Sequence, residues 1–258
     1  MRKPFIAGNW KMNTDIASAL ALVKDIAGRI GRLDDIDVAV CPPFVYLHAV
    51  ADALSASNIA LGAQNVFFQP NGAFTGEISA AMLKDLSCAY VIIGHSERRH
   101  VIGETDDLIN KKIAAAINNG LLPIFCVGEL LEQRKTGKTS AVVTEQVKKG
   151  LAGLCTERIQ AVTIAYEPVW AIGTGINATP EQAQEVHAMI RDLLACLYDK
   201  TIASNLRIQY GGSAKPDNTA QLMTQPDVDG LLVGGASLKA DDFASMVNTA
   251  VKIKTGSN

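Results

Sequence analysis

The strongest constraint on the fold is a regular alternation, along the whole chain, of short apolar segments with segments of helical periodicity. The apolar segments are rich in Val, Ile, Leu and Ala and lack the polar alternation of a half-exposed sheet, a pattern typical of parallel strands covered on both faces. Eight segments are predicted as strands: residues 5–11, 38–41, 59–64, 90–94, 122–127, 162–165, 207–210 and 230–233.

A segment of helical spacing follows each predicted strand. In the first of them Leu20, Val23 and Ala27 recur at helical intervals and form one apolar stripe. Thr179 is predicted to cap a later helix in which Pro180 takes the first position. The predicted helices are 17–30, 45–54, 79–86, 106–119, 140–151, 180–197, a short one from 216, and 241–252.

Repeated strand–helix units at a spacing of roughly 30 residues favour a closed (β/α)8 barrel over an open doubly wound sheet. No shift in composition and no Pro- or Ser-rich linker interrupts the series. We therefore expect an α/β protein with a single barrel domain over residues 1–258.

Composition supports a large core and excludes several partners. Hydrophobic residues make up 48% of the chain and charged residues 19%, and the formal net charge is −2. Because nucleic acids and anionic membranes require a basic surface, neither is expected as a partner. The five cysteines are scattered, form no C-x-x-C pair, and are expected to be thiols in a reducing compartment: Cys41, Cys88, Cys126, Cys155 and Cys196.

Targeting and cofactor motifs are also missing from the sequence. No signal-peptide pattern follows the N-terminal residues and no apolar run reaches the length of a membrane span, so a cytoplasmic location is expected. No G-x-G-x-x-G pattern follows the first predicted strand, and neither a Walker loop nor an H-E-x-x-H pattern occurs in the chain. We therefore expect no cofactor and no metal.

Polar residues and glycines gather at the ends of the predicted strands. In a (β/α)8 barrel these ends share one face, and that face carries the active site. The strand-end residues are Asn9, Lys11, Gln64, Asn65, His95, Glu97, Glu129, Glu167, Gly211, Gly212, Ser213, Gly234 and Gly235.

The last two strands end in glycine-rich turns that could bind a phosphate group. Gly211-Gly212-Ser213 and Gly234-Gly235 expose backbone N–H groups without an intervening Cβ, at the usual phosphate site of this fold. Gly173 could add a further donor. The alternative is that these glycines only allow tight turns.

Three side chains together indicate acid–base chemistry on a small phosphorylated carbonyl compound. Glu167 can move a proton between adjacent carbons, and Lys11 can offset the charge of phosphate and enediolate. His95 is expected at a helix start, where the helix dipole favours the neutral imidazole as a donor. Each residue alone would more often have a structural or surface role, whereas all three on one barrel face favour a catalytic one.

Longer motifs resemble the triosephosphate isomerase family over nearly the whole chain. They are Asn9-Trp10-Lys11-Met12-Asn13, Gly94-His95-Ser96-Glu97-Arg98-Arg99, Cys126-Val127-Gly128-Glu129, the stretch 165–175 (AYEPVWAIGTG), 209–213 (QYGGS) and 232–236 (LVGGA). The resemblance implies interconversion of dihydroxyacetone phosphate and D-glyceraldehyde 3-phosphate, a step of glycolysis and gluconeogenesis.

The resemblance also implies a role for each site residue. Glu167 would be the proton acceptor, His95 the electrophile, and Asn9 and Lys11 substrate contacts, with Glu97 in positioning or proton relay. The phosphate would be held by Gly173, Ser213, Gly234 and Gly235. In the stretch after Glu167, Pro168-Val169-Trp170 would form the first hinge of a lid.

The resemblance further implies a homodimer. The loop 64–79 carries Phe67, Phe68 and Phe74, a costly set to expose on a monomer. Its tip matches the family segment that docks beside the partner's active site, so Phe74, Thr75 and Gly76 are predicted dimer contacts. The alternative is a loop folded onto its own barrel.

The sequence departs from the family pattern at a few positions. Ile176-Asn177 replaces a common lysine and its neighbour at the second hinge, Thr14 replaces a common glycine, and Ala214 a common valine.

Two other functions stay open at this point. One is isomerisation of another phosphosugar on the same barrel, and the other is a catalytically silent barrel that binds phosphorylated metabolites or a protein partner.

Overall fold

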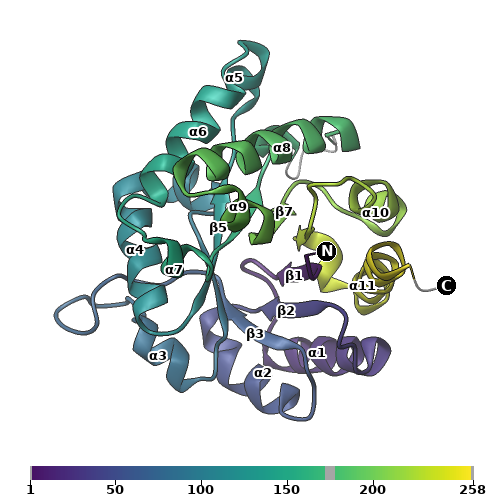
Figure 1. Cartoon of the computed structure of the whole chain (residues 1–258). Coiled ribbons are helices and arrows are strands. Elements are labelled where there is room, and N and C mark those ends of the chain that lie inside the picture. The colour runs from purple at the N-terminus through teal and green to yellow at the C-terminus, as the bar shows by residue number, and fades with distance from the viewer. Residues whose placement is uncertain (1, 172–177, 257–258) are drawn as a thin grey trace.

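A closed barrel of eight parallel strands forms the centre of the computed structural model, which describes residues 2–171 and 178–256 (Figure 1). Each strand pairs with its neighbours in sequence, and β1 closes the barrel by pairing with β8. This arrangement confirms the predicted (β/α)8 fold. The strands are β1 (Phe5–Asn9), β2 (Asp37–Cys41), β3 (Ala60–Ala63), β4 (Tyr90–Ile93), β5 (Leu122–Val127), β6 (Thr163–Tyr166), β7 (Ile208–Tyr210) and β8 (Gly230–Val233).

Both faces of the barrel wall are apolar, which explains the continuous apolar strand segments. Along β1, Phe5 and Ala7 belong to a small cluster made of strand residues, which fills the barrel interior. Ile6 lies between them and belongs to the larger cluster that includes the helices. Since successive side chains of a strand point to opposite faces, the apolar strand positions divide between these two clusters.

The helices surround the barrel (Figure 1). Thr179 caps α8 as predicted, since its Oγ1 accepts the Gln182 N–H at 3.2 Å and Pro180 is the first helical residue. The short helices α5, α7 and α9 were not predicted, because segments of four to six residues carry no helical periodicity. The helices are α1 (Ile16–Ile30), α2 (Leu47–Leu54), α3 (Ala80–Asp85), α4 (Asp106–Asn118), α5 (Leu131–Lys135), α6 (Thr139–Gly150), α7 (Thr156–Ile159), α8 (Pro180–Leu197), α9 (Lys200–Asn205), α10 (Pro216–Met223) and α11 (Ala240–Thr255).

The first strand is shorter than predicted, and its end positions a lysine for the site. β1 stops at Asn9, and Lys11 has a φ of 53°, in the left-handed region that a side chain with a Cβ rarely adopts. Gln64 Nε2 donates to the Lys11 carbonyl at 2.8 Å, and the Lys11 N–H donates to Asn9 Oδ1 at 3.0 Å. The strained backbone is therefore fixed by hydrogen bonds on both sides. Thr14, at the position where glycine is common, also has a positive φ of 73°.

The aromatic loop between β3 and α3 extends away from the barrel (Figure 1). The Phe67 and Phe74 ring centroids lie 4.9 Å apart, and the Phe67 N–H donates to the Ile78 carbonyl at 2.8 Å. Phe67 and Phe68 are half-buried in this loop, whereas Phe74 stays 40% exposed. The rings therefore shield one another only in part.

No helix in the described part of the chain is both long and apolar enough to cross a membrane.

Candidate active site

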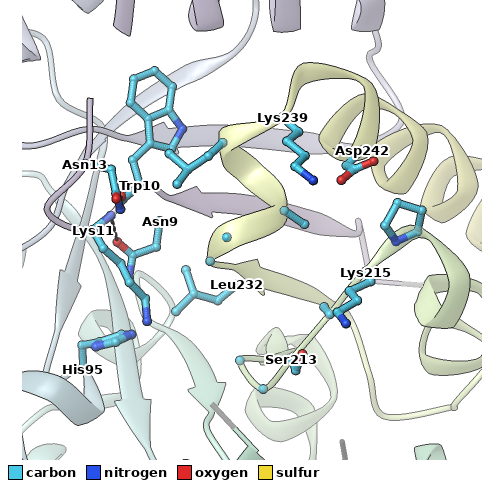
Figure 2. A pocket seen from close by; sticks show the side chains of 18 of the residues that line it. Asn9, Trp10, Lys11, Asn13, His95, Ser213, Lys215, Leu232, Lys239 and Asp242 are labelled. Atoms are coloured by element: carbon cyan, nitrogen blue, oxygen red, sulfur yellow. Dashed lines mark hydrogen bonds between the residues drawn. The ribbon is translucent and has the colours of Figure 1, made fainter. Parts of the chain in front are cut away.

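Six of the predicted site residues line a single cavity of about 870 Å³ at the carboxyl ends of the strands (Figure 2). This volume lies within the usual range of small-molecule sites. Asn9, Lys11 and His95 lie at one end of the cavity, and the glycine turns after β7 and β8 also line it. The six are Asn9, Lys11, His95, Ser213, Gly234 and Gly235. Gly173 and the Ile176-Asn177 pair lie outside the described residues.

Glu167 follows β6 directly and lies behind the cavity wall. Its side chain is buried, with the residue only 1% exposed, and its Oε2 accepts the Ser96 N–H at 2.8 Å. Its Oε1 lies 2.9 Å from His95 Nε2, although the geometry is not that of a hydrogen bond. Glu167 is not among the cavity-lining residues. In this position the carboxylate is held by the Ser96 N–H outside the cavity lining.

His95 precedes a helical turn that begins at Ser96 and continues as the π-helical segment η2 (Arg98–Ile102). Its carbonyl accepts the Arg98 N–H at 2.8 Å, and its ring Nδ1 accepts the Glu97 N–H at 3.3 Å. An accepting Nδ1 leaves the proton of a neutral ring on Nε2, which lies toward Glu167.

The charges around His95 raise its pKa while Glu167 is close. Burial lowers the pKa of His95, but the charges of Glu167 and Glu97 outweigh it, and the net effect raises that pKa. The prediction of a neutral His95 imidazole took into account only its position at the start of a helix. The structure adds two carboxylates that act in the opposite direction.

Lys11 and Glu97 form an ion pair at the mouth of the site. Lys11 Nζ donates to Glu97 Oε1 at 2.5 Å, and Glu97 Oε2 lies 3.5 Å from His95 Nδ1. The Glu97 side chain is half-exposed and that of Lys11 is 28% exposed. Glu97 therefore contacts both Lys11 and His95 but is itself open to solvent.

Two glycines enclose Glu167, and neither leaves space for a Cβ. A Cβ at Gly128 would lie 1.7 Å from the Glu167 carbonyl oxygen, and one at Gly211 would lie 2.9 Å from Glu167 Cγ. The Glu167 N–H donates to the Val127 carbonyl at 2.7 Å, which continues the β5–β6 ladder. The backbone of Glu167 is thus held between β5 and β7.

The segment after Glu167 is anchored to Glu129, which is fully buried. The Glu129 carboxylate accepts the Tyr166 hydroxyl at 3.1 Å and the Trp170 indole N–H at 2.9 Å. Its backbone carbonyl accepts the Val169 N–H at 3.1 Å. The predicted first hinge, Pro168-Val169-Trp170, thus begins in a segment with fixed contacts and includes the start of the short helix η3 (Val169–Ala171).

The two glycine turns differ in how much space surrounds them. Gly211 and Gly212 are crowded, and a Cβ at Gly212 would lie only 2.3 Å from the Tyr210 hydroxyl oxygen. For Gly234 the nearest atom to such a Cβ is Lys11 Cε at 3.5 Å, and for Gly235 no described atom lies within 4 Å. Packing thus explains the glycines after β7, whereas those after β8 border open cavity.

Cationic side chains surround the cavity at both ends. Lys11 lies at the end with His95, and Lys215 and Lys239 line the opposite end, where Asp242 is also found (Figure 2). An anionic ligand is favoured between them, close to the glycines after β8.

Several contacts that organise the site could not be inferred from residue type. The Ser96 N–H that holds Glu167 is a backbone group. Arg99 Nε donates to the Gly94 carbonyl at 2.8 Å and its Nη2 to the Cys126 carbonyl at 3.0 Å, joining the ends of β4 and β5. The position of Gln64 at a strand end was visible in the sequence, but its contact with Lys11 was not.

No group of three or more His, Cys, Asp or Glu side chains in the described ranges could hold a metal ion. The five cysteines are free thiols, three of them buried.

The fold and the site together define a class of protein: a (β/α)8 barrel with a carboxylate–imidazole pair at a cavity suited to a small anion. A family model described as "Triosephosphate isomerase" matches residues 4–250. The chain belongs to the triosephosphate isomerase family.

Relatives with this name are similar over almost their entire length. The triosephosphate isomerase of Carboxydothermus hydrogenoformans is 57% identical over 97% of this chain and 100% of its own. Those of Herpetosiphon aurantiacus and Rhodopirellula baltica are 55% and 51% identical, each over 96% of this chain and 99% and 98% of their own.

Substitution Gly235→Ala should weaken anion binding without harming the fold. The new methyl group has space in the described structure but would occupy the cavity where an anion approaches the backbone. We expect the dissociation constant for inorganic phosphate, measured by calorimetry, to rise about tenfold, the loss expected for one charge-assisted hydrogen bond.

A matched control is Gly28→Ala, which also introduces a methyl group into open space but lies in α1. It should leave phosphate binding unchanged. Equal phosphate affinity in Gly235→Ala and the parent protein would contradict a phosphate site at the β8 turn.

Proposed function

We propose that this chain interconverts dihydroxyacetone phosphate and D-glyceraldehyde 3-phosphate through an enediolate, without a cofactor or metal. The observation that carries the proposal is the buried Glu167 carboxylate 2.9 Å from His95, behind a cavity lined by Asn9, Lys11 and the β8 glycines. Membership of the family and the names of its relatives support the same activity.

Glu167 is the proposed base. Its carboxylate leaves the Ser96 N–H, takes a proton from the carbon next to the substrate carbonyl, and returns it to the adjacent carbon. The carbonyl oxygen becomes the enediolate oxygen during the first transfer. It then takes up the proton of the neighbouring hydroxyl group, whose oxygen becomes the carbonyl oxygen of the product when the carbon proton is returned. The backbone of Glu167 stays fixed by Val127, so that the motion is confined to the side chain.

His95 and Lys11 are proposed to stabilise the charge that develops on the substrate. The Nε2–H of a neutral His95 donates to the substrate oxygens, and the Glu97 N–H at Nδ1 supports this tautomer. Lys11 supplies positive charge, and Asn9 can donate from its side-chain amide. Departure of the Glu167 carboxylate from Nε2 removes the main charge that raises the His95 pKa, which favours the neutral ring during the reaction.

The phosphate group is proposed to bind at Ser213, Gly234 and Gly235, with a further contact from Gly173. The open space at Gly234 and Gly235 supports this assignment, because backbone N–H groups at a turn can approach an anion where no Cβ intervenes. Glu97 is proposed to position Lys11 and His95 through the contacts described above.

Replacement of the base, Glu167→Gln, should lower kcat about 10²- to 10⁴-fold, the usual contribution of a general base. The amide keeps the shape of the side chain and can still accept the Ser96 N–H. Rates are measured in both directions with coupled assays, and inorganic phosphate inhibition serves as the control, which should be unchanged. Near-normal turnover would end the assignment of Glu167, and an inactive parent enzyme would end the proposed activity.

We also propose that the chain forms a homodimer in the cytoplasm. Phe74, Thr75 and Gly76 are exposed at the tip of the projecting loop, and Met12, Val45 and other apolar side chains on the loops after β1, β2 and β4 are exposed too. An exposed apolar set of this kind is typical of an interface between subunits.

The free cysteines support the proposed cytoplasmic location, because unpaired thiols are typical of a reducing compartment.

Substitution Phe74→Asp should shift the protein from dimer to monomer in sedimentation velocity at micromolar concentration, because a carboxylate would be desolvated in the interface. Leu197→Asp is a matched control, since Leu197 is also 40% exposed but lies at the end of α8. A parent protein that sediments as a stable, active monomer would contradict the dimer.

A further inference from the structure

Gln146, on the outer helix α6, makes a paired contact with the barrel beside the proposed base. Its Oε1 accepts the Gly128 N–H at 2.7 Å, and its Nε2 donates to the Gly128 carbonyl at 3.1 Å. Both groups are buried, and Gln146 is 9% exposed. One side-chain amide thus satisfies the donor and the acceptor of a single backbone residue.

Gly128 is the residue through which this contact reaches Glu167. It follows the last residue of β5, and its Cα is so close to the Glu167 carbonyl that a Cβ would lie 1.7 Å from the carbonyl oxygen. The residues on either side of Gly128 bond to the same segment, since the Val127 carbonyl accepts the Glu167 N–H and the Glu129 carbonyl accepts the Val169 N–H. A shift of Gly128 would therefore move the backbone from which the base extends.

We propose that Gln146 is a positioning residue for the catalytic carboxylate: by holding Gly128, it fixes the backbone of Glu167. The inference rests on the proposed function of Glu167 and adds a residue on a different helix, outside the cavity. Displacement of a catalytic group by about 1 Å can cost about 100-fold in rate. The contact therefore matters for turnover more than for substrate affinity.

The test compares two substitutions at this position. Gln146→Met keeps the length of the side chain and removes both hydrogen bonds, whereas Gln146→Glu keeps the acceptor for the Gly128 N–H and loses the donor to the Gly128 carbonyl. We expect kcat to fall about 10- to 100-fold in both variants. The inhibition constant for inorganic phosphate should stay within about twofold of the parent, because the glycines after β8 are untouched.

The matched control is Val143→Ala, one turn earlier on α6 and fully buried. It should lower the melting temperature through the lost packing while kcat is retained, which separates loss of stability from loss of positioning. Gln146→Glu provides the readout if Gln146→Met does not fold.

The outcomes are distinguishable from failure of the proposed function. If the parent enzyme converts triose phosphates and the Gln146 variants keep its kcat, the positioning role is wrong while the proposed activity stands. If the inhibition constant for inorganic phosphate rises together with the loss of kcat, the positioning role is also wrong, because the contact of Gln146 would then support the whole site. A parent enzyme without activity on triose phosphates would overturn the proposed function itself.

Discussion

The site depends on one interaction, the close approach of the buried Glu167 carboxylate to His95. Burial alone would lower the pKa of the imidazole, and the neighbouring carboxylates reverse that direction. The same carboxylate accepts a backbone N–H from Ser96. Gly211 packs against the side chain of Glu167 and Gly128 against its backbone carbonyl, and neither position has space for a Cβ. Barrel topology makes this arrangement possible, because it brings residues distant in the chain to adjacent strand ends.

The sequence predicted the architecture well because the signal was repeated. Parallel strands covered on both faces need continuous apolar segments, and eight such segments followed by helices leave few alternative topologies. The boundaries were less certain where the backbone is irregular. At Lys11 the strand ends early in a left-handed conformation supported by Gln64, and nothing in the local sequence specifies that long-range contact.

Asn9, Lys11, His95, Glu97 and Glu167 lie close together in the described structure, but their electrostatic relations could not be read from residue type. The expectation of a neutral His95 followed from the helix start alone, whereas the distance to Glu167 depends on the fold. Gly211 and Gly212 were interpreted as part of a phosphate site, with tight turns as the alternative, and the contacts with Glu167 and Tyr210 that exclude a Cβ there could not be read from the sequence. Gln146 carried no signal, since a glutamine on an amphipathic helix usually faces solvent.

The account rests on the close electrostatic contact between Glu167 and His95, and an NMR titration of the ¹⁵N-labelled His95 ring tests it most directly. In the parent protein without substrate, His95 should titrate above its ordinary pKa of 6.5. In the Glu167→Gln protein its pKa should fall below that of the parent, because burial remains and the principal opposing charge is removed. An unchanged or higher pKa in Glu167→Gln would contradict the account.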